Sequence, residues 1–346
     1  MCSNFVIVSE SGEDLHLPSY DNVRQFRDGS AEFEELLKRL GAYKAIILHG
    51  LFHPWQEKGL RSVTSQVKVA WVFWGGDIYG RSDIKDTYLS RKSKRLLWLH
   101  KLKMMLAGKR ITEPYEIPIE LLGRIDYCLT DIPEDFDFVS KYVGNGMKEL
   151  WYNYYSVEDT IGTLSASNVT GNNILIGNSC TIECNHLDAF RCLKKFKLEQ
   201  TKLVVPLSYG PPWLRNTLCK IGEKRFKNHF MPLVNFLPRE DYNRVILGCS
   251  IVIMPHYRPQ AFGNILTALW LGCRVYLSER NPLYSFFKKK GILIYSMEKD
   301  LKPNCPDALK ALSEEQRNAN RVIISSIYSK EVMHQKNLEI VKILDA

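Results

Sequence analysis

The sequence lacks three features that would assign it to common protein classes. It has no run of about 18 apolar residues, so no segment is predicted to span a membrane. Its nine cysteines are scattered and form no Cys-x-x-Cys pair, which disfavours a zinc site or a disulfide framework and favours a reducing compartment. It has neither a Gly-x-Gly-x-x-Gly nor a Gly-x-x-x-x-Gly-Lys-Ser/Thr loop, so dinucleotide-dependent oxidoreductases and P-loop ATPases are disfavoured.

What the sequence does contain is an ordinary globular composition with an excess of positive charge. Hydrophobic residues make up 45% of the 346 residues and charged residues 25%, which disfavours a disordered or fibrous chain. The length exceeds the size at which single cores stop growing, so two domains are expected. The net charge of +9 predicts an anionic partner: nucleic acid, anionic lipid or a phosphorylated substrate.

In the first half of the chain, three short apolar runs each lead to a residue suited to proton transfer. The pairs of run and residue are 45–48 with His49, 67–73 with Asp77, and 125–130 with Asp131. Such runs, alternating with helical segments, predict strands of a parallel sheet whose carboxyl ends share one edge. A side chain at this edge can act as a general base and take the proton of a bound hydroxyl group. Asp77 is the preferred candidate, His49 the second and Asp131 the third. Helix capping by Asp77 and a core position for His49 are the structural alternatives.

The second half contains the stretch around which the candidate binding site is organised, residues 254–272. An apolar run ends at Pro255, a polar loop follows, and helical spacing begins at Gly263-Asn264. Free backbone N–H groups at a helix start attract anions, and a guanidinium can grip two phosphate oxygens. The stretch therefore predicts a diphosphate-binding loop, with an ordinary strand-to-helix connection as the alternative.

Residues 91–110 are rich in lysine and arginine and contain no acidic residue. Apolar side chains recur among them at helical spacing, which predicts a basic amphipathic helix that attaches to an anionic membrane surface. The residues expected to make that contact are Lys94, Arg95, Trp98, Lys101 and Lys103. The alternative is a packed helix with a solvated basic edge. Nucleic-acid binding is disfavoured, because aromatic residues are not interleaved with the cations and no nucleic-acid motif is present.

The predicted domain division follows from a polar stretch, 159–173, which has no apolar periodicity and is expected to be an interdomain linker. Residues 1–158 are then an acceptor-side Rossmann-like domain, and 174–328 a nucleotide-sugar-binding Rossmann-like domain. Residues 329–346 are expected to form a C-terminal helix that packs back on the first domain. The expected fold class is α/β, with two Rossmann-like domains facing across a cleft, as in GT-B glycosyltransferases and nucleotide-sugar epimerases.

The order of these motifs resembles a known family, the TDP-Fuc4NAc:lipid II Fuc4NAc transferases (4-acetamido-4,6-dideoxygalactose transferases), glycosyltransferase family 56. The resemblance covers residues 48–301. The motifs that carry it are His49-Gly-x-Phe-x-Pro54, Trp74-Gly-x-Asp-x-Tyr79, Gly177-Asn-Ser179, His186, Pro206-x-x-Tyr209, Arg258-x-Gln-x-x-Gly263 and Asn281-Pro282. The chain departs from the family at Ala261, where a glycine can occur, at Asn264, where a threonine can occur, and at the glycine inserted after Tyr209.

The resemblance implies a glycosyltransferase that moves a deoxyamino sugar from a TDP-Fuc4NAc-like donor to an undecaprenyl-diphosphate-linked glycan in bacterial surface polysaccharide synthesis. It also implies a peripheral protein at the cytoplasmic face of the inner membrane. No metal cofactor is expected, so basic side chains and helix N-termini must stabilise the departing diphosphate.

The residues expected to bind the donor are Gly177, Asn178, Ser179, Tyr209, His256, Arg258, Gln260, Gly263 and Asn264. For Asn178 and Ser179 the alternative role is helix capping, and for Arg258 it is a surface salt bridge. Two alternative functions also remain: a nucleotide-sugar epimerase, and a non-catalytic protein of the same fold that binds membranes or polyanions.

Overall fold

The computed structural model describes residues 4–10, 20–110, 113–144 and 146–346. The chain divides into two compact units, each of which contains several segments of sequence. Unit 1 combines Met1–Ile78, Glu113–Tyr152 and Gln335–Ala346, and unit 2 combines Tyr79–Thr112 and Asn153–His334. Each unit is an α/β structure with parallel sheets, which confirms the predicted α/β class.

Unit 1 contains a two-stranded and a four-stranded parallel sheet. The first pairs β1 (Phe5–Ser9) with β2 (Val23–Arg27). The second has the order β3 (Ala45–His49), β4 (Lys68–Val72), β5 (Tyr127–Thr130) and β6 (Lys148–Trp151), which is also their order in the chain. Its helices are α1 (Ala31–Lys38), α2 (Pro54–Ser62), α5 (Ile119–Leu122) and α6 (Pro133–Val143), and α3 (Gly76–Tyr79) ends at the unit boundary.

Unit 2 is built on a six-stranded parallel sheet with the order β12-β11-β10-β7-β8-β9. The strands are β7 (Asn173–Ile176), β8 (Leu203–Pro206), β9 (Phe230–Leu233), β10 (Cys249–Met254), β11 (Arg274–Leu277) and β12 (Tyr295–Ser296). The chain runs outward from β7 to β9 and then returns to place β10 beside β7. This reversal is the topological switch point of a doubly wound sheet, and ligands bind at the carboxyl ends of the strands there.

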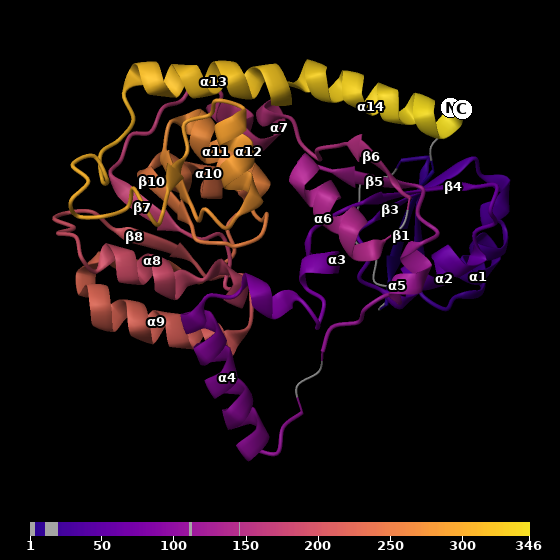
Figure 1. The fold of residues 1–346 in the computed structure, drawn as a ribbon, viewed down its shortest axis with the longest axis horizontal. Helices are drawn as coiled ribbons and strands as arrows, with labels where there is room; N and C mark the ends of the chain where they lie inside the picture. Colours follow the sequence, from indigo (N-terminus) through magenta and orange to yellow (C-terminus); the bar gives the residue numbers. More distant parts are fainter. Residues whose placement is uncertain (1–3, 11–19, 111–112, 145) are drawn as a thin grey trace. The chain divides into compact units, whose positions relative to one another are not determined.

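The helices of unit 2 cover both faces of this sheet (Figure 1). On one side lie α8 (His186–Leu193) and α9 (Pro212–Phe226), and on the other lie α10 (Arg239–Leu247), α11 (Phe262–Leu271) and α12 (Pro282–Lys289). The remaining helices of the unit are α4 (Arg91–Leu106), α7 (Val157–Ile161) and α13 (Glu314–Tyr328). Strands β8, β10 and β11 are buried along their whole length, as expected for a sheet covered on both faces.

The predicted first domain, 1–158, differs from unit 1 because Tyr79–Thr112 belongs to unit 2. The reason is packing: Leu96 of α4 joins the core of unit 2, and the His100 ring stacks on Trp213 of α9 at 3.8 Å. The Lys92 ammonium also forms an ion pair with Asp188 of α8 at 3.0 Å. The position of α4 between strands of unit 1 in the sequence gave no sign of these contacts.

The predicted linker, 159–173, is part of unit 2. Its first residues continue α7, in which Val157 and Ile161 are buried and which packs on α11. Further along, the N–H groups of Val169 and Thr170 donate to the carbonyls of Leu271 and Leu247, at the C-terminal ends of α11 and α10. The polar composition therefore reflects a segment that pairs through its backbone with helix ends rather than a free joint.

The last helix, α14 (Lys330–Asp345), begins in unit 2, and its residues from Gln335 belong to unit 1. The Lys44 ammonium lies 2.8 Å from the Asp345 carboxylate, and Lys68 donates to the carbonyl of Ile343 at 2.9 Å. These bonds hold the end of α14 to β4 and to the residue before β3 within unit 1. Among the described residues, no helix is long and apolar enough to cross a membrane.

Candidate functional site

The predicted donor residues lie at the carboxyl edge of the unit 2 sheet, at its switch point. Gly177 follows β7, and the loop 255–261 follows β10, the strand next to β7. Two backbone bonds join the loops at this edge: the Gly177 N–H donates to the Ile253 carbonyl at 2.8 Å, and the Cys180 N–H donates to the Tyr209 carbonyl at 2.6 Å. Residues as far apart in the sequence as Gly177 and Ile253 are thereby joined at one edge.

A polar network under this edge connects most of the predicted donor side chains. The Gln260 amide donates to Asn178 Oδ1 at 3.2 Å. Both side chains also contact the thiol of Cys184, which is fully buried. The other polar atoms around that sulfur are Nε2 of His256 at 3.2 Å, Oγ1 of Thr181 at 3.4 Å and Oγ of Ser179 at 3.5 Å. The sequence did not single out Cys184, and no spacing rule would have found it.

Gly177 allows the loop after β7 to lie against His186. Its φ of +69° favours glycine, and a Cβ added there would lie 2.8 Å from Nε2 of His186. His186 is 3% exposed, its Nε2 has no hydrogen-bond partner among the described residues, and burial lowers its pKa. A buried imidazole of this kind stays neutral at pH 7 and leaves a polar atom available close to the edge.

His256 lies in the same buried layer with 0% exposure. Burial, together with the nearby Arg258 guanidinium, lowers its pKa to about 3, so the ring is neutral. Its Nε2 contacts the Cys184 sulfur, whereas Nδ1 has no partner among the described residues. His256 is therefore placed to orient neighbouring groups and is a poor acid at neutral pH.

Arg258 is positioned by the backbone around it. Asn281, which is fully buried, donates from its amide nitrogen to the Arg258 carbonyl at 3.0 Å, and its Oδ1 caps α12 by accepting from the Leu283 N–H. The guanidinium of Arg258 bonds only to the neighbouring carbonyl of Pro259, at 3.2 Å, and pairs with no carboxylate in the described part of the chain. A surface salt bridge, the structural alternative for Arg258, is thus not observed there, and the guanidinium remains available to an anion.

The first turn of α11 supplies the backbone donors expected of an anion site. Its N-cap, Ala261, makes no side-chain cap bond, so the N–H groups of the first turn, at Gly263 and Asn264, are not capped. Ala261 has a φ of 60°. That conformation lies in the left-handed region, which favours glycine over alanine. A Cβ on Gly263 would meet only Thr160, at 3.6 Å, so packing alone does not require glycine there.

Tyr209 is held by its backbone but exposes its side chain. Its carbonyl is fixed by Cys180, and its ring is 75% exposed. An exposed aromatic ring at the predicted donor edge can stack on a nucleobase. The structure therefore places all nine predicted donor residues on one edge of unit 2, and their roles remain predictions.

The three proton-transfer candidates also share one edge, that of the four-stranded sheet of unit 1. His49 is level with Val72 on β4, which in turn is level with Leu129 on β5. Asp77 is 7% exposed, and its Oδ2 accepts from the Trp71 indole at 2.8 Å. The Trp74 N–H also donates to Oδ2, at 3.4 Å. Asp77 therefore holds the Trp71 indole and the Trp74 backbone in place. It is not the N-cap residue of a helix, because it lies inside α3.

His49 and Asp131 have pKa values shifted in directions that bear on their use as bases. Desolvation lowers the pKa of His49, although the residue remains exposed at the end of β3, so its ring is neutral at pH 7. Burial and the Asp135 carboxylate raise the pKa of Asp131 to about 8, so this carboxyl is largely protonated at pH 7. A neutral imidazole can accept a proton at that pH and a protonated carboxyl cannot, which favours His49 over Asp131.

The predicted membrane residues lie on α4, whose two faces differ. Ser93, Leu96 and His100 face unit 2, and the opposite face carries exposed apolar side chains. These are Trp98 at 60%, Met105 at 66% and Leu106 at 78% exposure. Lys94, Arg95 and Lys103 are exposed on the same helix and Lys101 is partly exposed. The far end of α4 extends away from α8 and α9 (Figure 1).

Asn185 attaches the start of α4 to the donor edge, which the sequence did not reveal. The residue is fully buried with a φ of 46°. Its Oδ1 accepts from the Ser90 N–H at 2.8 Å, and its amide donates to the carbonyls of Tyr88 at 3.1 Å and Pro255 at 3.3 Å. Ser90 is the N-cap of α4, so one side chain connects that helix to the loop after β10.

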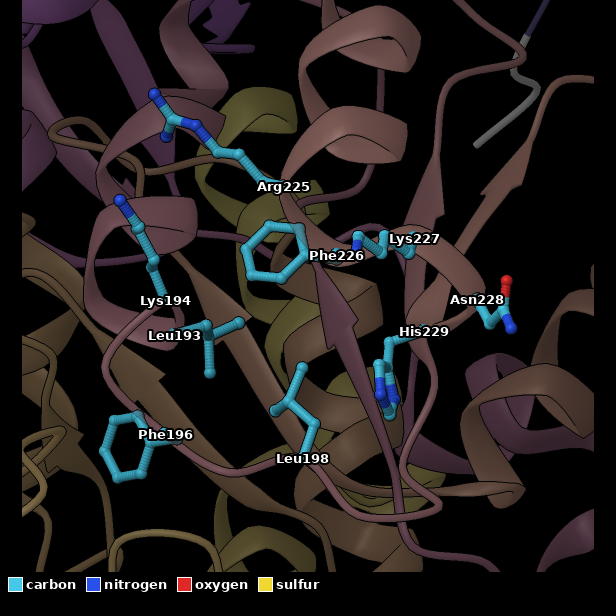
Figure 2. A pocket seen from close by; sticks show the side chains of 9 residues that line it. All are labelled: Leu193, Lys194, Phe196, Leu198, Arg225, Phe226, Lys227, Asn228 and His229. Atoms are coloured by element: carbon cyan, nitrogen blue, oxygen red, sulfur yellow. The ribbon is translucent and has the colours of Figure 1, made fainter.

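A cavity of about 330 Å³ lies at the opposite edge of the unit 2 sheet (Figure 2). The residues that line it precede strands β8 and β9, so they are at the amino ends of those strands. Apolar side chains such as Leu198 and Phe226 form part of the wall, and Lys194, Arg225 and Lys227 are its cations. Each cation stands at the C-terminal end of α8 or α9, where positive charge stabilises the helix dipole without any ligand.

No group of three metal-binding side chains comes together in the described parts of the chain. That the reaction needs no metal stays a prediction.

Solved structures with the same fold define the class of protein. Sucrose-phosphate synthase from Thermosynechococcus elongatus is 10% identical, with a TM-score of 0.63 over 98% of this chain and 88% of that chain. A UDP-forming α,α-trehalose-phosphate synthase from Burkholderia xenovorans, solved with glucose-6-phosphate, is 10% identical, with a TM-score of 0.61 over 98% and 90%. An α-glucosyltransferase in complex with UDP is 11% identical, with a TM-score of 0.58 over 98% and 91%. The fold is that of the GT-B glycosyltransferases.

The particular family follows from the sequence. The pattern that defines the family described as 4-α-L-fucosyltransferase, glycosyl transferase group 56, matches residues 1–319. The chain therefore belongs to glycosyltransferase group 56 and is a glycosyltransferase that uses a nucleotide-sugar donor, which confirms the predicted resemblance. No curated protein sequence matches the chain.

Proposed function

We propose that this glycosyltransferase moves a deoxyamino sugar, of the TDP-Fuc4NAc kind, to an undecaprenyl-diphosphate-linked glycan. The observation that supports a nucleotide-sugar site most strongly is the arrangement at the switch point of unit 2. On one edge there, the described residues bring together a guanidinium that pairs with no carboxylate, a helix N-terminus without a side-chain cap and two connected amides. Such an edge suits a ligand with a diphosphate and a polar sugar.

In the proposed reaction, the acceptor hydroxyl oxygen forms a bond with the anomeric carbon as the bond from that carbon to the diphosphate breaks. The leaving group takes the bonding electrons, and Arg258 with the N–H groups of Gly263 and Asn264 stabilises its charge. The hydroxyl proton passes to a base on the carboxyl edge of the unit 1 sheet. We favour His49 for that role, because Asp77 is bonded to Trp71, and we propose no metal ion.

We further propose that the protein acts at the cytoplasmic face of the inner membrane, where α4 contacts the lipid. Exposed Trp98, Met105 and Leu106 provide apolar burial, and the surrounding Lys94, Arg95, Lys101 and Lys103 attract anionic headgroups. The helix has no acidic residue, so nothing on it opposes this attraction. A lipid-linked acceptor is embedded in the same membrane surface, so attachment of α4 to that surface brings the enzyme close to its acceptor.

A vesicle assay tests the membrane proposal. Trp98→Ser with Leu106→Ser, and separately Lys94→Gln with Arg95→Gln, are expected to reduce sedimentation with anionic vesicles at least about tenfold, because apolar burial and charge both contribute to binding. The control is Lys220→Gln with Lys224→Gln on α9, which removes the same charge from another basic helix. Equal sedimentation of all variants would exclude α4 as the contact.

A transfer assay tests the reaction. The protein is incubated with TDP- and UDP-activated sugars and a polyprenyl-diphosphate glycan, with and without EDTA, and products are identified by mass. The expected result is one added deoxyamino sugar per acceptor, unaffected by EDTA. Conversion of the donor without an acceptor would support the epimerase instead, and binding of polyanions without turnover of any donor would support the non-catalytic alternative.

A further inference from the structure

The thiol of Cys184 lies where the loops of the donor edge meet. Its sulfur is within 3.7 Å of polar atoms from the loop after β7, from Thr181 and from the loop after β10. The side chain is fully buried, so these atoms are its surroundings in place of water. Four of the five neighbouring residues are expected to bind the donor: Asn178, Ser179, His256 and Gln260.

The thiol has one hydrogen, and that number limits how the network can be arranged. The Gln260 amide donates to the sulfur and to Asn178 Oδ1, so its hydrogens are assigned. The thiol hydrogen can be donated to one acceptor only: Asn178 Oδ1, His256 Nε2, or the hydroxyl oxygen of Ser179 or Thr181. If any acceptor other than His256 receives it, the His256 ring must be protonated at Nε2 to bond to the sulfur, and Nδ1 is an acceptor. If His256 receives it, Nδ1 carries the proton and is a donor.

We propose that Cys184 is a positioning residue of the donor site, which holds His256 in one tautomer and fixes the orientation of the Asn178 and Gln260 amides. The proposal rests on the assignment of this edge to the nucleotide sugar. Nδ1 of His256 and Oε1 of Gln260 are both buried without partners among the described residues. Whether each of these positions donates a hydrogen bond to a ligand or accepts one therefore depends on the arrangement around the sulfur. An alanine at position 184 removes that constraint and leaves both amides and the ring free to reorient.

The experiment compares Cys184→Ala and Cys184→Ser with Cys192→Ala. Cys192 is half-buried in α8, packs against the core of the same unit and is outside the network, so it controls for loss of a thiol. Binding of TDP and UDP is measured by calorimetry, KM and kcat by transfer, and the His256 tautomer by nitrogen NMR of ¹⁵N-histidine protein, with the signal assigned by His256→Gln. Thermal unfolding confirms that each variant folds.

Loss of one or two neutral hydrogen bonds predicts that Cys184→Ala weakens nucleotide affinity about 5- to 30-fold and raises KM more than it lowers kcat. Its His256 signals should show both tautomers, where the unmodified protein shows one. Cys184→Ser keeps a group that can both donate and accept a hydrogen bond, so it should recover most of the nucleotide affinity. The affinity of Cys192→Ala should equal that of the unmodified protein. An unchanged affinity and a single tautomer in Cys184→Ala would overturn the proposal. If the unmodified protein binds no nucleotide sugar, the proposed function fails, and the tautomer measurement still reports separately on Cys184.

Discussion

The carboxyl edges of the two parallel sheets carry candidate residues of similar kinds, but the two edges are organised differently. In unit 2, Asn178, Gln260 and His256 share one buried network around Cys184. In unit 1, Asp77 is bonded to the Trp71 and Trp74 of its own strand and loop. The first edge combines distant segments into one surface, and the second presents residues that each belong to a local structure.

Sheet topology explains the difference. In unit 2 the strand order reverses between β7 and β10, and in doubly wound sheets such a reversal is the position at which ligands bind. In the four-stranded sheet of unit 1 the strands follow one another in chain order, and no reversal occurs. The comparison teaches that a polar residue directly after a strand is not equally good evidence for a binding site in every sheet, because the topology decides which loops can share a ligand.

The largest expected effect comes from removing the proposed base on unit 1. His49→Gln should lower kcat about 10²- to 10⁴-fold, the usual contribution of a general base. Asp77→Asn keeps the size of the side chain and an acceptor for the Trp71 indole, and should lower kcat less than about tenfold. Transfer rates at saturating donor measure both. A greater loss in Asp77→Asn than in His49→Gln would assign the proton to Asp77 and remove our distinction between scaffold and base.

The pH profile of the same reaction separates the candidates further. Because desolvation lowers the pKa of His49, its ring is already neutral near pH 7, and the rate should be flat above about pH 6.5 and fall only at lower pH. Asp131, with a pKa of about 8, ionises only in more alkaline solution. A rate that rises between pH 7 and 9 would therefore indicate Asp131.

The next effect concerns unit 2, where Arg258→Ala should lower the transfer rate about 10²- to 10³-fold, since the departing diphosphate loses its guanidinium. Arg244→Ala, which removes an exposed arginine paired with Asp241 on α10, is the control and should change little. Full activity of Arg258→Ala would show that the anion site of this edge is not used in transfer.

A smaller effect is expected on stability at unit 1. The Asp131 carboxyl is protonated when folded and ionised when unfolded over the range from its ordinary pKa near 4 to about 8, so the protein loses stability as pH rises through that window. Asp131→Asn removes this loss. Its Tm should match that of the unmodified protein at pH 4 and exceed it by at least about 2 °C at pH 8.5, as measured by thermal unfolding. An equal Tm at pH 8.5 would show that Asp131 is well solvated.

Much of the fold was predictable because the strands of a covered parallel sheet are continuous apolar runs. β3, β4, β5 and β10 all lie where those runs occur. β6 was missed: its sequence, Lys148-Glu-Leu-Trp151, has two charged residues in four, as is common for a strand at the edge of a sheet.

The candidate site was predictable only to the level of its loops. Residues after strands could be named from the sequence, since the ends of parallel strands share an edge. Which side chains meet beneath that edge depends on packing over long sequence distances, as with Asn185 and Pro255, 70 positions apart. The same holds for α4, whose attachment to unit 2 rests on Leu96 and His100 and not on any local pattern.

The central claim is that the donor diphosphate binds at the first turn of α11, and the affinity of Gly263→Ala for TDP and UDP tests it most directly. A Cβ there meets only Thr160 at an ordinary distance, so the variant should fold with a Tm no lower than that of the unmodified protein. Gly59→Ala, in α2 of unit 1 with nothing within 4 Å of the added carbon, is the matched control. We predict affinity at least about tenfold weaker for Gly263→Ala alone, because the Cβ blocks close approach of a phosphate to the backbone. Undiminished nucleotide binding by Gly263→Ala would contradict the account.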